Sequence, residues 1–344
     1  MRRLRPDSDT MPDQKPKAPT LKTIAAMTGL SLSTVSLSLR DGARLKPETR
    51  EKVARAAAEI GYVPNRAGVR LRTGQTNVLT LILSIERNTL DYTRLLIQGI
   101  GAHLLGSAYH LNVTPELPGS DPLETLNYIL ANKTSDGVIL THTSARDPRV
   151  QRLEEAGLPF VTHGRTAFGI EHAYIDFHVE RFIDLALERT LSRNRRRFMY
   201  VPFDNGTTNF RNTVEHFQHE VAQRGLDGEV VLDAHSIQSA ASARDFARAA
   251  ATSAKPPDAI FCTNEVTAVA VLEGMTDGGK RCGEDFDLIC KRTTELLPAL
   301  YPQIDTVTED LFEAGRHIAE LLLCQLKGAP VSELQKLHEP TPSW

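Results

Sequence analysis

A short segment near the start of the chain carries side chains suited to binding nucleic acid. Between residues 31 and 39, apolar side chains recur at helical spacing, which predicts a short helix. Near its beginning this helix exposes four side chains, namely Leu32, Ser33, Ser36 and Leu37. Hydroxyls can bond to base edges, and a leucine can contact the methyl group of thymine. The segment therefore predicts direct contact with DNA bases.

Two further helical patterns flank this segment. The first covers Leu21–Met27, with Thr20 as its N-cap and Gly29 as its breaker, and the second covers Pro47–Ile60, with Gly61 as its C-cap. A helix, a short turn containing glycine and a second helix form the signature of a helix-turn-helix. In that motif the second helix enters the major groove.

Polar and basic side chains around the motif can bind DNA phosphates, which position a protein on the duplex. The candidates are Thr20, Lys22, Thr34, Arg40, Arg44, Thr49 and Arg50. Two alternatives stay open: Thr34 could serve as a capping or packing residue, and Arg40 and Arg44 could be surface charges.

The charge of the chain is unevenly distributed. Residues 1–74 hold 15 basic and 7 acidic residues, a balance of +8, whereas the other 270 hold 25 and 36, a balance of -11. A basic head on an acidic body indicates that the head binds a polyanion, with a solvated basic tail as the alternative.

The sequence lacks the familiar catalytic patterns. It contains no GxSxG, HExxH, P-loop or GxGxxG motif, so we expect no enzyme, no metal site and no cofactor. The four cysteines are widely spaced, which favours reduced thiols in the cytoplasm. The sequence contains no run of 18 apolar residues, so no membrane span is predicted. Residues 1–19 are polar and proline-rich, which predicts disorder. They have no apolar segment, so no secretory signal is expected. Met11 is an alternative start.

From Asn77 onward, apolar strands alternate with amphipathic helices. The run VLTLILSI at 78–85 is typical of a strand buried on both faces, and seven further strands and eight helices are predicted up to residue 326. This alternation predicts doubly wound parallel sheets, and the length favours two similar lobes. Ligands bind such folds beyond the carboxyl ends of the strands, between the lobes.

Residues 20–76 resemble the headpiece of LacI/GalR-family regulators without a gap. The matching pieces are T-L-x-x-I-A, G-L-S-x-S-T-V-S, P-E-T-R-E-K-V, G-Y-x-P-N-R and L-R-T-G-x-T-N. The resemblance continues more weakly through residues 77–328. It implies a helix-turn-helix domain at 20–64, a hinge helix and linker at 65–76, and an effector-binding and dimerisation domain at 77–344. The implied fold class is an all-α headpiece joined to a two-lobed α/β domain similar to periplasmic binding proteins.

The resemblance also implies roles in the hinge. Asn65 and Arg66 would contact DNA, and Leu71 would insert between base steps in the minor groove, with simple linker filler as the alternative for Leu71. Many family members carry arginine where this chain has Leu37, and arginine would read guanine. We therefore expect an unusual half-site at that step.

In the body, the resemblance implies an effector site between the lobes. Its candidate residues are Tyr92, His163, Arg165, Asp176, Arg211, Asn264 and Arg292. Arg211 could instead form a surface ion pair, and Asn264 could be a helix N-cap. Arg292 stands where the family commonly has a sugar-binding aspartate, so one hypothesis is an anionic effector, such as a sugar phosphate or sugar acid. Alternatively, Arg292 points to solvent or pairs with an acid.

Together these features predict a cytoplasmic, nucleoid-associated regulator with three partners: double-stranded operator DNA, a small effector and a second copy of the chain. A homodimer is expected because a two-fold protein matches two half-sites. The regulator is expected to be a repressor without a further tetramerisation helix. The alternative is a solute-binding protein or a carbohydrate-acting enzyme with the same two-lobed fold.

Overall fold

The computed structural model describes residues 19–39, 45–62, 70, 74–84, 92–117, 119–232 and 239–344. The chain divides into two compact units, Met1–Gln75 and Thr76–Trp344. We call the first the headpiece and the second the body. No helix within the described ranges is long and apolar enough to cross a membrane.

Three helices form the described part of the headpiece: α1 (Leu21–Thr28), α2 (Leu32–Ser38) and α3 (Pro47–Glu59). Thr20 caps α1 by accepting a hydrogen bond from the backbone N–H of Thr23, and Ser31 caps α2 in the same way. The core between the three helices contains the fully buried side chains of Ile24, Val35 and Val53, one from each helix. The three helices expected from the sequence are therefore confirmed, with ends that differ by at most one residue.

The body contains two six-stranded sheets, one in each lobe. The sheet of the first lobe runs in the order β11-β5-β4-β3-β1-β2 and that of the second in the order β12-β10-β9-β8-β6-β7. The strands of the first lobe are β1 (Val78–Ser84), β2 (His110–Glu116), β3 (Gly137–Thr141), β4 (Phe160–His163), β5 (Ala173–Phe177) and β11 (Gln335–His338). Those of the second are β6 (Arg197–Val201), β7 (Asp227–Val230), β8 (Ala259–Cys262), β9 (Asp287–Arg292), β10 (Asp305–Thr308) and β12 (Thr341–Pro342). All pairings are parallel except that of β10 with β12.

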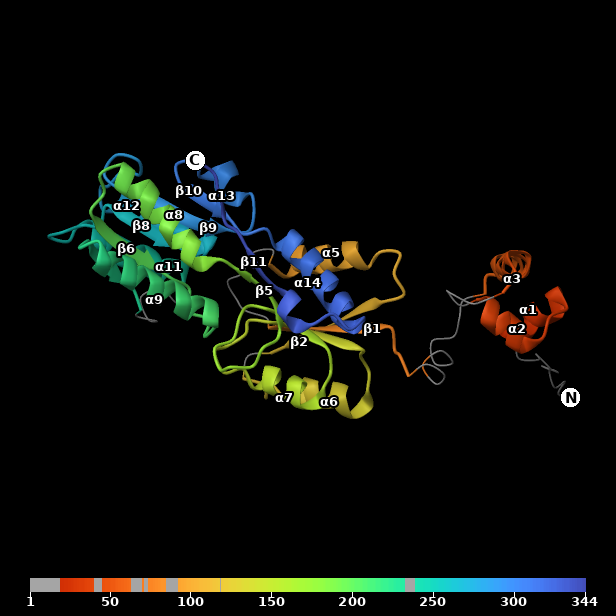
Figure 1. Cartoon of the computed structure of the whole chain (residues 1–344). Coiled ribbons are helices and arrows are strands. Elements are labelled where there is room, and N and C mark those ends of the chain that lie inside the picture. The colour runs from red at the N-terminus through yellow and green to blue at the C-terminus, as the bar shows by residue number, and fades with distance from the viewer. Residues whose placement is uncertain are drawn as a thin grey trace, which may run out of the picture. The chain divides into compact units, whose positions relative to one another are not determined.

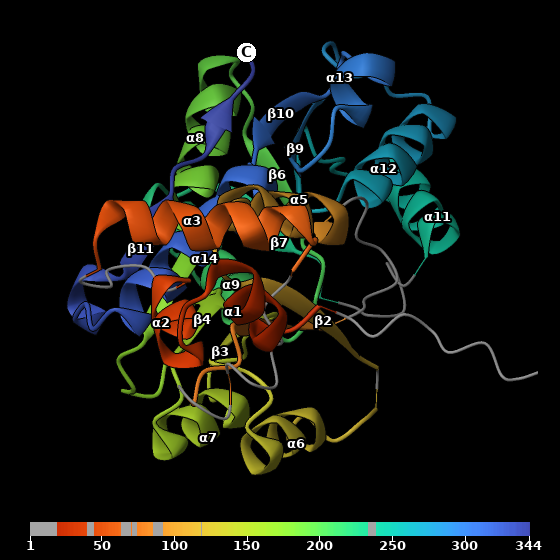
Figure 2. The ribbon, with the colours of Figure 1, turned by 90° about the vertical axis from the view of Figure 1, so that its right-hand side faces the viewer.

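Helices cover both faces of each sheet. In the first lobe, α5 (Tyr92–Leu104) and α14 (Leu311–Leu326) pack together on one face, and α6 (Glu124–Asn132) and α7 (Pro148–Ala156) lie on the other (Figure 1). In the second lobe, α8 (Val179–Ser192) and α9 (Thr208–Gln223) cover one face. The opposite face is covered by α11 (Ala240–Ala251) and α12 (Glu265–Asp277), seen to the right of the strands in Figure 2.

The alternation of side chains along the strands explains this double covering. Leu79 and Leu81 of β1 pack against α5 and α14, whereas Ile82 packs against α6 and α7. A strand buried on both faces must be apolar at successive positions, as the sequence of β1 is. The two-lobed α/β fold predicted from the sequence is confirmed.

Three short segments cross between the lobes. The chain passes from β5 to α8 at His178, from β10 to α14 at residues 309–310, and from β11 to β12 at residues 339–340. The first and third crossings are joined, because His178 Nδ1 lies 2.9 Å from Glu339 Oε1. These crossings therefore form the hinge about which the two lobes would move.

The end of the chain differs from the expectation. Beyond α14 it forms a short 3-10 helix, η1 (Val331–Glu333), and then adds β11 to the first sheet and β12 to the second. The strands β5 and β10 and the short helix α13 (Leu296–Leu300) were not expected either. The missed strands are short, and each forms only by pairing with other strands of its sheet.

Candidate functional site

A cleft between the two lobes lies beyond the carboxyl ends of the strands, where α/β folds bind ligands. The first lobe lines it with Tyr92, His142, Thr143, His163, Gly164 and Asp176. The second lobe lines it with Tyr200, Phe203, Asn205, Thr207, Asn209, Phe210, Thr213, Thr263, Asn264, Glu265, Lys291 and Thr293, and Glu309 lies in a crossing segment. Hydroxyls, amides, carboxylates and aromatic rings dominate this lining.

The wall formed by the first lobe is built on the ends of β3, β4 and β5. The Tyr92 hydroxyl lies 2.6 Å from His163 Nδ1, which fixes the ring at the end of β4. His142 follows β3 in a left-handed conformation, with φ of 54°, and its ring packs against Tyr92. Its Nδ1 atom is buried and has no hydrogen-bond partner within the described ranges. This polar atom is therefore available to a ligand.

The opposite wall rests on β6, β8 and β9. Asn264 caps α12 by accepting from the Thr267 N–H, so its helix-capping role is directly visible. Glu265 accepts from the Thr294 hydroxyl at 2.8 Å. The Tyr200 hydroxyl is fully buried in this wall, beside Thr213 and Thr263.

Polar contacts join the two walls. Asn209 of α9 donates to Asp176 of β5 at 3.2 Å, and the Thr208 N–H donates to the Thr143 carbonyl at 3.0 Å. Both contacts would have to break or rearrange if the lobes moved apart. The cleft is thus a natural place to couple ligand binding to lobe movement.

Lys291 and Glu309 form a buried ion pair at the base of the cleft. The Lys291 ammonium donates to Glu309 Oε2, and only 5% of the Glu309 side chain is exposed. Burial opposes ionisation of Glu309, but Lys291 and His163 outweigh it and lower the pKa of the carboxyl. Glu309 also lies in a crossing between the lobes, so this charge lies both in the ligand site and at the hinge.

Four of the residues that the sequence suggested for effector binding meet in this cleft: Tyr92, His163, Asp176 and Asn264. The three arginines do not line it, which corrects the expected placement. Arg165 donates to Asp176 and Glu180, Arg211 is exposed beside Glu215, and Arg292 bonds to Glu295 and Thr306. A carboxylate lies within ion-pair distance of each arginine, which favours the alternative ion-pair roles, and the anionic effector stays an untested prediction.

Several lining residues were missed in the sequence, among them His142, Tyr200, Lys291 and Glu309. The signal that could have found His142 and Glu309 is their position directly after a strand, since every such residue reaches the same edge of the sheet. Lys291 lies within β9, where the prediction from the sequence chose the adjacent Arg292 instead. Tyr200 carries no signal of this kind, because an aromatic residue inside a strand is typical of core.

His142 gives the body a testable pH dependence. Burial, helped by the nearby charges of His163 and Arg149, lowers the pKa of His142 to about 4. The unfolded chain binds this proton below pH 6.5, whereas the folded chain does not until about pH 4, so stability falls as the pH drops through this window. We expect a loss of about 2 kcal/mol between pH 7 and pH 5 that His142→Asn abolishes. Asparagine suits the left-handed backbone, and urea unfolding at both pH values measures the difference.

Equal pH dependence in the native chain and His142→Asn would contradict this assignment. Burial also lowers the pKa of His163 and of His172, but both residues are present in the two proteins, so their contributions cancel.

The headpiece offers a second candidate site on the exposed face of α2. Leu32 and Leu37 are 45% and 36% exposed, and Ser33 is exposed between them. The hydroxyls of Ser33 and Thr34 each lie 2.8 Å from the hydroxyl of the capping residue Ser31, which supports a capping role for Thr34. The exposed face of α2 thus combines two leucines with a serine.

The remaining predicted DNA contacts are spread over the headpiece. Thr20, Lys22 and Arg50 are exposed, and Ser36 and Thr49 are half-buried. Arg40, Arg44, Asn65, Arg66 and Leu71 lie outside the described residues.

Comparison with known proteins identifies both units. Residues 20–65 match the family described as bacterial regulatory proteins, lacI family, and residues 187–344 match the periplasmic binding protein-like domain. The headpiece is a LacI-family DNA-binding domain. The chain is 28% identical over 317 residues to the transcriptional regulator AglR of Rhizobium meliloti, covering 88% of this chain and 86% of that one. It is 26% identical to the regulator CelR of Thermobifida fusca, covering 95% and 97%.

The fold comparison agrees. The structure of the lac repressor dimer bound to operator and an anti-inducer aligns with a TM-score of 0.78 at 19% identity, covering 95% of this chain and 98% of that one. The CelR–cellobiose complex aligns with a TM-score of 0.67 at 24% identity, covering 95% and 98%. Together with the matched domains and the similar regulators, the fold makes the chain a transcriptional regulator with a LacI-family DNA-binding headpiece and a periplasmic-binding-protein-like body.

Proposed function

We propose that this regulator represses transcription from a palindromic operator as a homodimer, and that a neutral, hydroxyl-rich effector in the cleft controls its affinity for DNA. One observation carries the effector proposal. His142 Nδ1 is buried in the wall formed by the first lobe and has no hydrogen-bond partner within the described ranges, and hydroxyl groups including that of Tyr200 line the opposite wall. A ligand with several hydroxyls supplies donors and acceptors to both walls at once.

The charges of the lining support a neutral ligand. Asp176, Glu265 and Glu309 contribute three carboxylates, whereas Lys291 is paired with Glu309 and the nearby arginines lie outside the lining. An added phosphate or carboxylate would meet these acids without an unpaired cation to balance it. Carboxylates readily accept hydrogen bonds from hydroxyls, and Phe203 and Phe210 provide apolar surface for the face of a sugar ring. The cellobiose bound to the similar regulator CelR supports a sugar.

The experiment compares matched pairs of ligands with the full chain. Thermal stability is measured with neutral mono- and disaccharides and with the phosphate or acid derivative of each. We expect stabilisation by a neutral sugar, loss of stabilisation by its anionic derivative, and release of a palindromic operator in a mobility shift by the same neutral sugar. Binding of anionic derivatives alone would overturn the neutral-effector proposal.

Tyr200→Phe tests the role of the buried hydroxyl. Because phenylalanine keeps the fully buried ring and a typical hydrogen bond contributes only about 1 kcal/mol, the variant should stay within about 1 kcal/mol of the stability of the native chain. It should nevertheless bind the effector about tenfold more weakly, as expected for one lost hydrogen bond of about 1.4 kcal/mol. Calorimetric titration and thermal melts provide both values.

The control for this variant is Tyr128→Phe, because the Tyr128 side chain is 63% exposed and lies on α6 away from the cleft lining. Tyr128→Phe should change neither the thermal stability nor the effector affinity. An unchanged effector affinity in Tyr200→Phe would remove the hydroxyl from the site.

For DNA, we propose contacts from the exposed face of α2, the flanking phosphate-binding residues and the hinge segment at 65–76, with Leu71 as the minor-groove wedge. The operator-bound lac repressor dimer supports this arrangement and the homodimer. We further propose that the chain acts as a binding protein without enzymatic activity, at the nucleoid in the cytoplasm. Turnover of the sugar that stabilises the chain would contradict this part.

Leu37→Arg should change which operator is bound. Arginine can donate two hydrogen bonds to guanine, and a good bidentate pair discriminates by about 1–3 kcal/mol, so we expect at least a fivefold shift toward guanine at one step of each half-site. Selection of binding sites from a random DNA pool, done in parallel with the native chain and Leu37→Ala, measures the preference. A native chain that already requires guanine at that step would show that Leu37 does not face it.

A further inference from the structure

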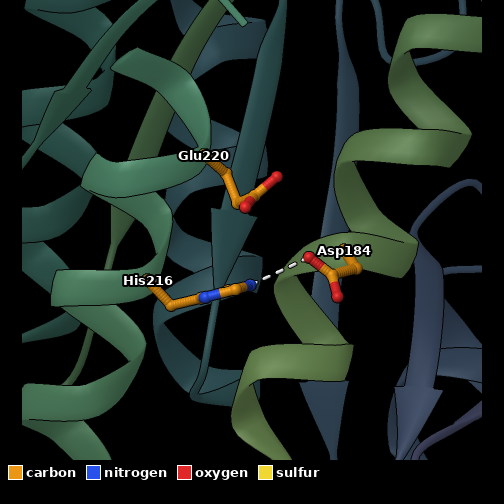
Figure 3. A group of neighbouring side chains, drawn as sticks. All are labelled: Asp184, His216 and Glu220. Carbon is orange, nitrogen blue, oxygen red and sulfur yellow. Dashed lines mark hydrogen bonds and ion pairs between the residues drawn. The ribbon is translucent and has the colours of Figure 1, made fainter. Parts of the chain in front are cut away.

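Outside the cleft, three potential metal ligands converge between α8 and α9. Asp184 comes from α8, whereas His216 and Glu220 lie one turn apart on α9. Figure 3 shows their side chains directed into the gap between the two helices. One ligand atom from each residue lies within 4.8 Å of the other two. We propose that these three side chains form a zinc-binding site that cross-links α8 and α9.

The chemistry of the donors favours zinc. Zinc takes imidazole nitrogen and carboxylate oxygen at about 2.0–2.2 Å, with three protein ligands and a water in many four-coordinate sites. Neighbouring ligands around a tetrahedral ion are about 3.4 Å apart at those bond lengths. His216 Nε2 and Asp184 Oδ1 are 2.9 Å apart, so small side-chain rotations suffice to admit the ion between them. An all-oxygen cation such as magnesium would leave the imidazole unused.

The available lone pairs also fit. Arg224 donates from Nε and Nη2 to the same oxygen of Glu220, Oε2, which leaves Oε1 outside both hydrogen bonds. Arg224 thus orients the carboxylate as an outer partner, a device that metal sites commonly use. Two carboxylates and a neutral imidazole together balance the double positive charge of zinc.

The backbone holds the ligands in place before the ion arrives. Each ligand is next in sequence to a fully or nearly fully buried side chain, because Ile183, Phe217 and Val221 all belong to the core beneath the two helices. The ligands themselves are partly shielded, with 29%, 23% and 19% of the side chains of Asp184, His216 and Glu220 exposed. Shielding lowers competition from water, and preorganisation lowers the cost of ordering the ligands.

A cross-link at this position would also reach the effector cleft. The first turns of α9 carry Asn209, Phe210 and Thr213, which line the cleft, and two of the proposed zinc ligands, His216 and Glu220, lie on the following turns of the same helix. Fixing α9 against α8 would therefore hold one wall of the cleft. This consequence adds to the proposed function, but zinc binding itself does not depend on the identity of the effector.

The test uses the full chain, freed of any purification tag and of metal by chelation. Zinc chloride is titrated by calorimetry, and thermal melts are recorded with and without zinc. We expect one zinc bound per chain and a rise in melting temperature of roughly 5 °C when zinc exceeds its dissociation constant a hundredfold. His216→Gln and Glu220→Gln should each weaken zinc binding at least tenfold and remove the rise.

His219→Gln is the matched control, because His219 is an exposed histidine on the same helix and lies outside the cluster. It should bind zinc as the native chain does. Equal zinc affinity in His216→Gln and the native chain, or no response of the native chain, would overturn the proposal and leave two ordinary ion pairs. Operator binding in metal-free buffer is measured alongside, so a failure here is distinct from a failure of the proposed function.

Discussion

Gly99→Ala is expected to destabilise the body by about 3 kcal/mol, the upper end of the usual cost of overpacking. Gly99 lies where α5 crosses α14, and a Cβ atom there would lie 2.0 Å from the backbone carbonyl oxygen of Phe312. Gly315 on α14 faces the same crossing, where its own Cβ would lie 2.3 Å from the Leu96 carbonyl oxygen. Because backbone atoms cannot rotate away as side chains can, the two helices would have to move apart. Urea unfolding of the variant measures the loss.

The same helix provides the control. Gly101 is exposed on α5, and a Cβ there meets no atom within 4 Å. Gly101→Ala should therefore raise stability by roughly 0.5–1 kcal/mol, the usual advantage of alanine over glycine inside a helix. Effects of the same sign and size at both positions would show that helix propensity, and not close packing, governs this region.

Lys291→Met is expected to cost about 3 kcal/mol, because it removes the partner of a buried carboxylate. Methionine preserves much of the length of the side chain and its contact with the Phe177 ring, over which the Lys291 ammonium lies 5.3 Å from the centroid. What is lost is the hydrogen-bonded charge on Glu309. The double variant Lys291→Met/Glu309→Gln should recover most of the loss, since it leaves no unpaired charge.

The pH dependence of the single variant gives a second measurement. Without Lys291, burial dominates and raises the pKa of Glu309, so the folded state gains protons at a higher pH than the unfolded state. Lys291→Met should then be less destabilised at pH 5 than at pH 8. A double variant no more stable than Lys291→Met at pH 8 would show that the ion pair contributes little to the fold.

Local signals explain why so much of the fold is readable from the sequence. Thr20 and Ser31 cap helices that begin one residue later, and the apolar run of β1 is a buried strand whichever neighbours it has. By contrast, β11 reads QKLH, which carries no strand signal of its own and pairs with β5 about 160 residues earlier. Such a segment becomes a strand only because the edge of β5 offers hydrogen-bonding groups to it.

The location of the cleft could be predicted from the sequence, but the charge of its lining could not. Residues after strands converge at one edge of a sheet by topology alone, which explains the presence of His163 and Asn264. Arg165 and Arg292 also follow strands or end them, yet both turn away to carboxylates at 176, 180 and 295. Sequence spacing reveals which residues reach an edge, whereas the partners that neutralise a charge depend on the completed fold.

The order in which the two lobes can be completed during synthesis follows from the path of the chain. The cores of the second lobe draw only on residues 177–307, which are contiguous. The first lobe needs α14 and β11, which are made after these cores. A ribosome therefore presents a second lobe that lacks only its edge strand β12, while one face of the sheet formed by β1 to β5 is covered by α5 but not yet by α14. We expect nascent chains that stop before residue 311 to recruit chaperones through that face, and chains that reach residue 338 to release them.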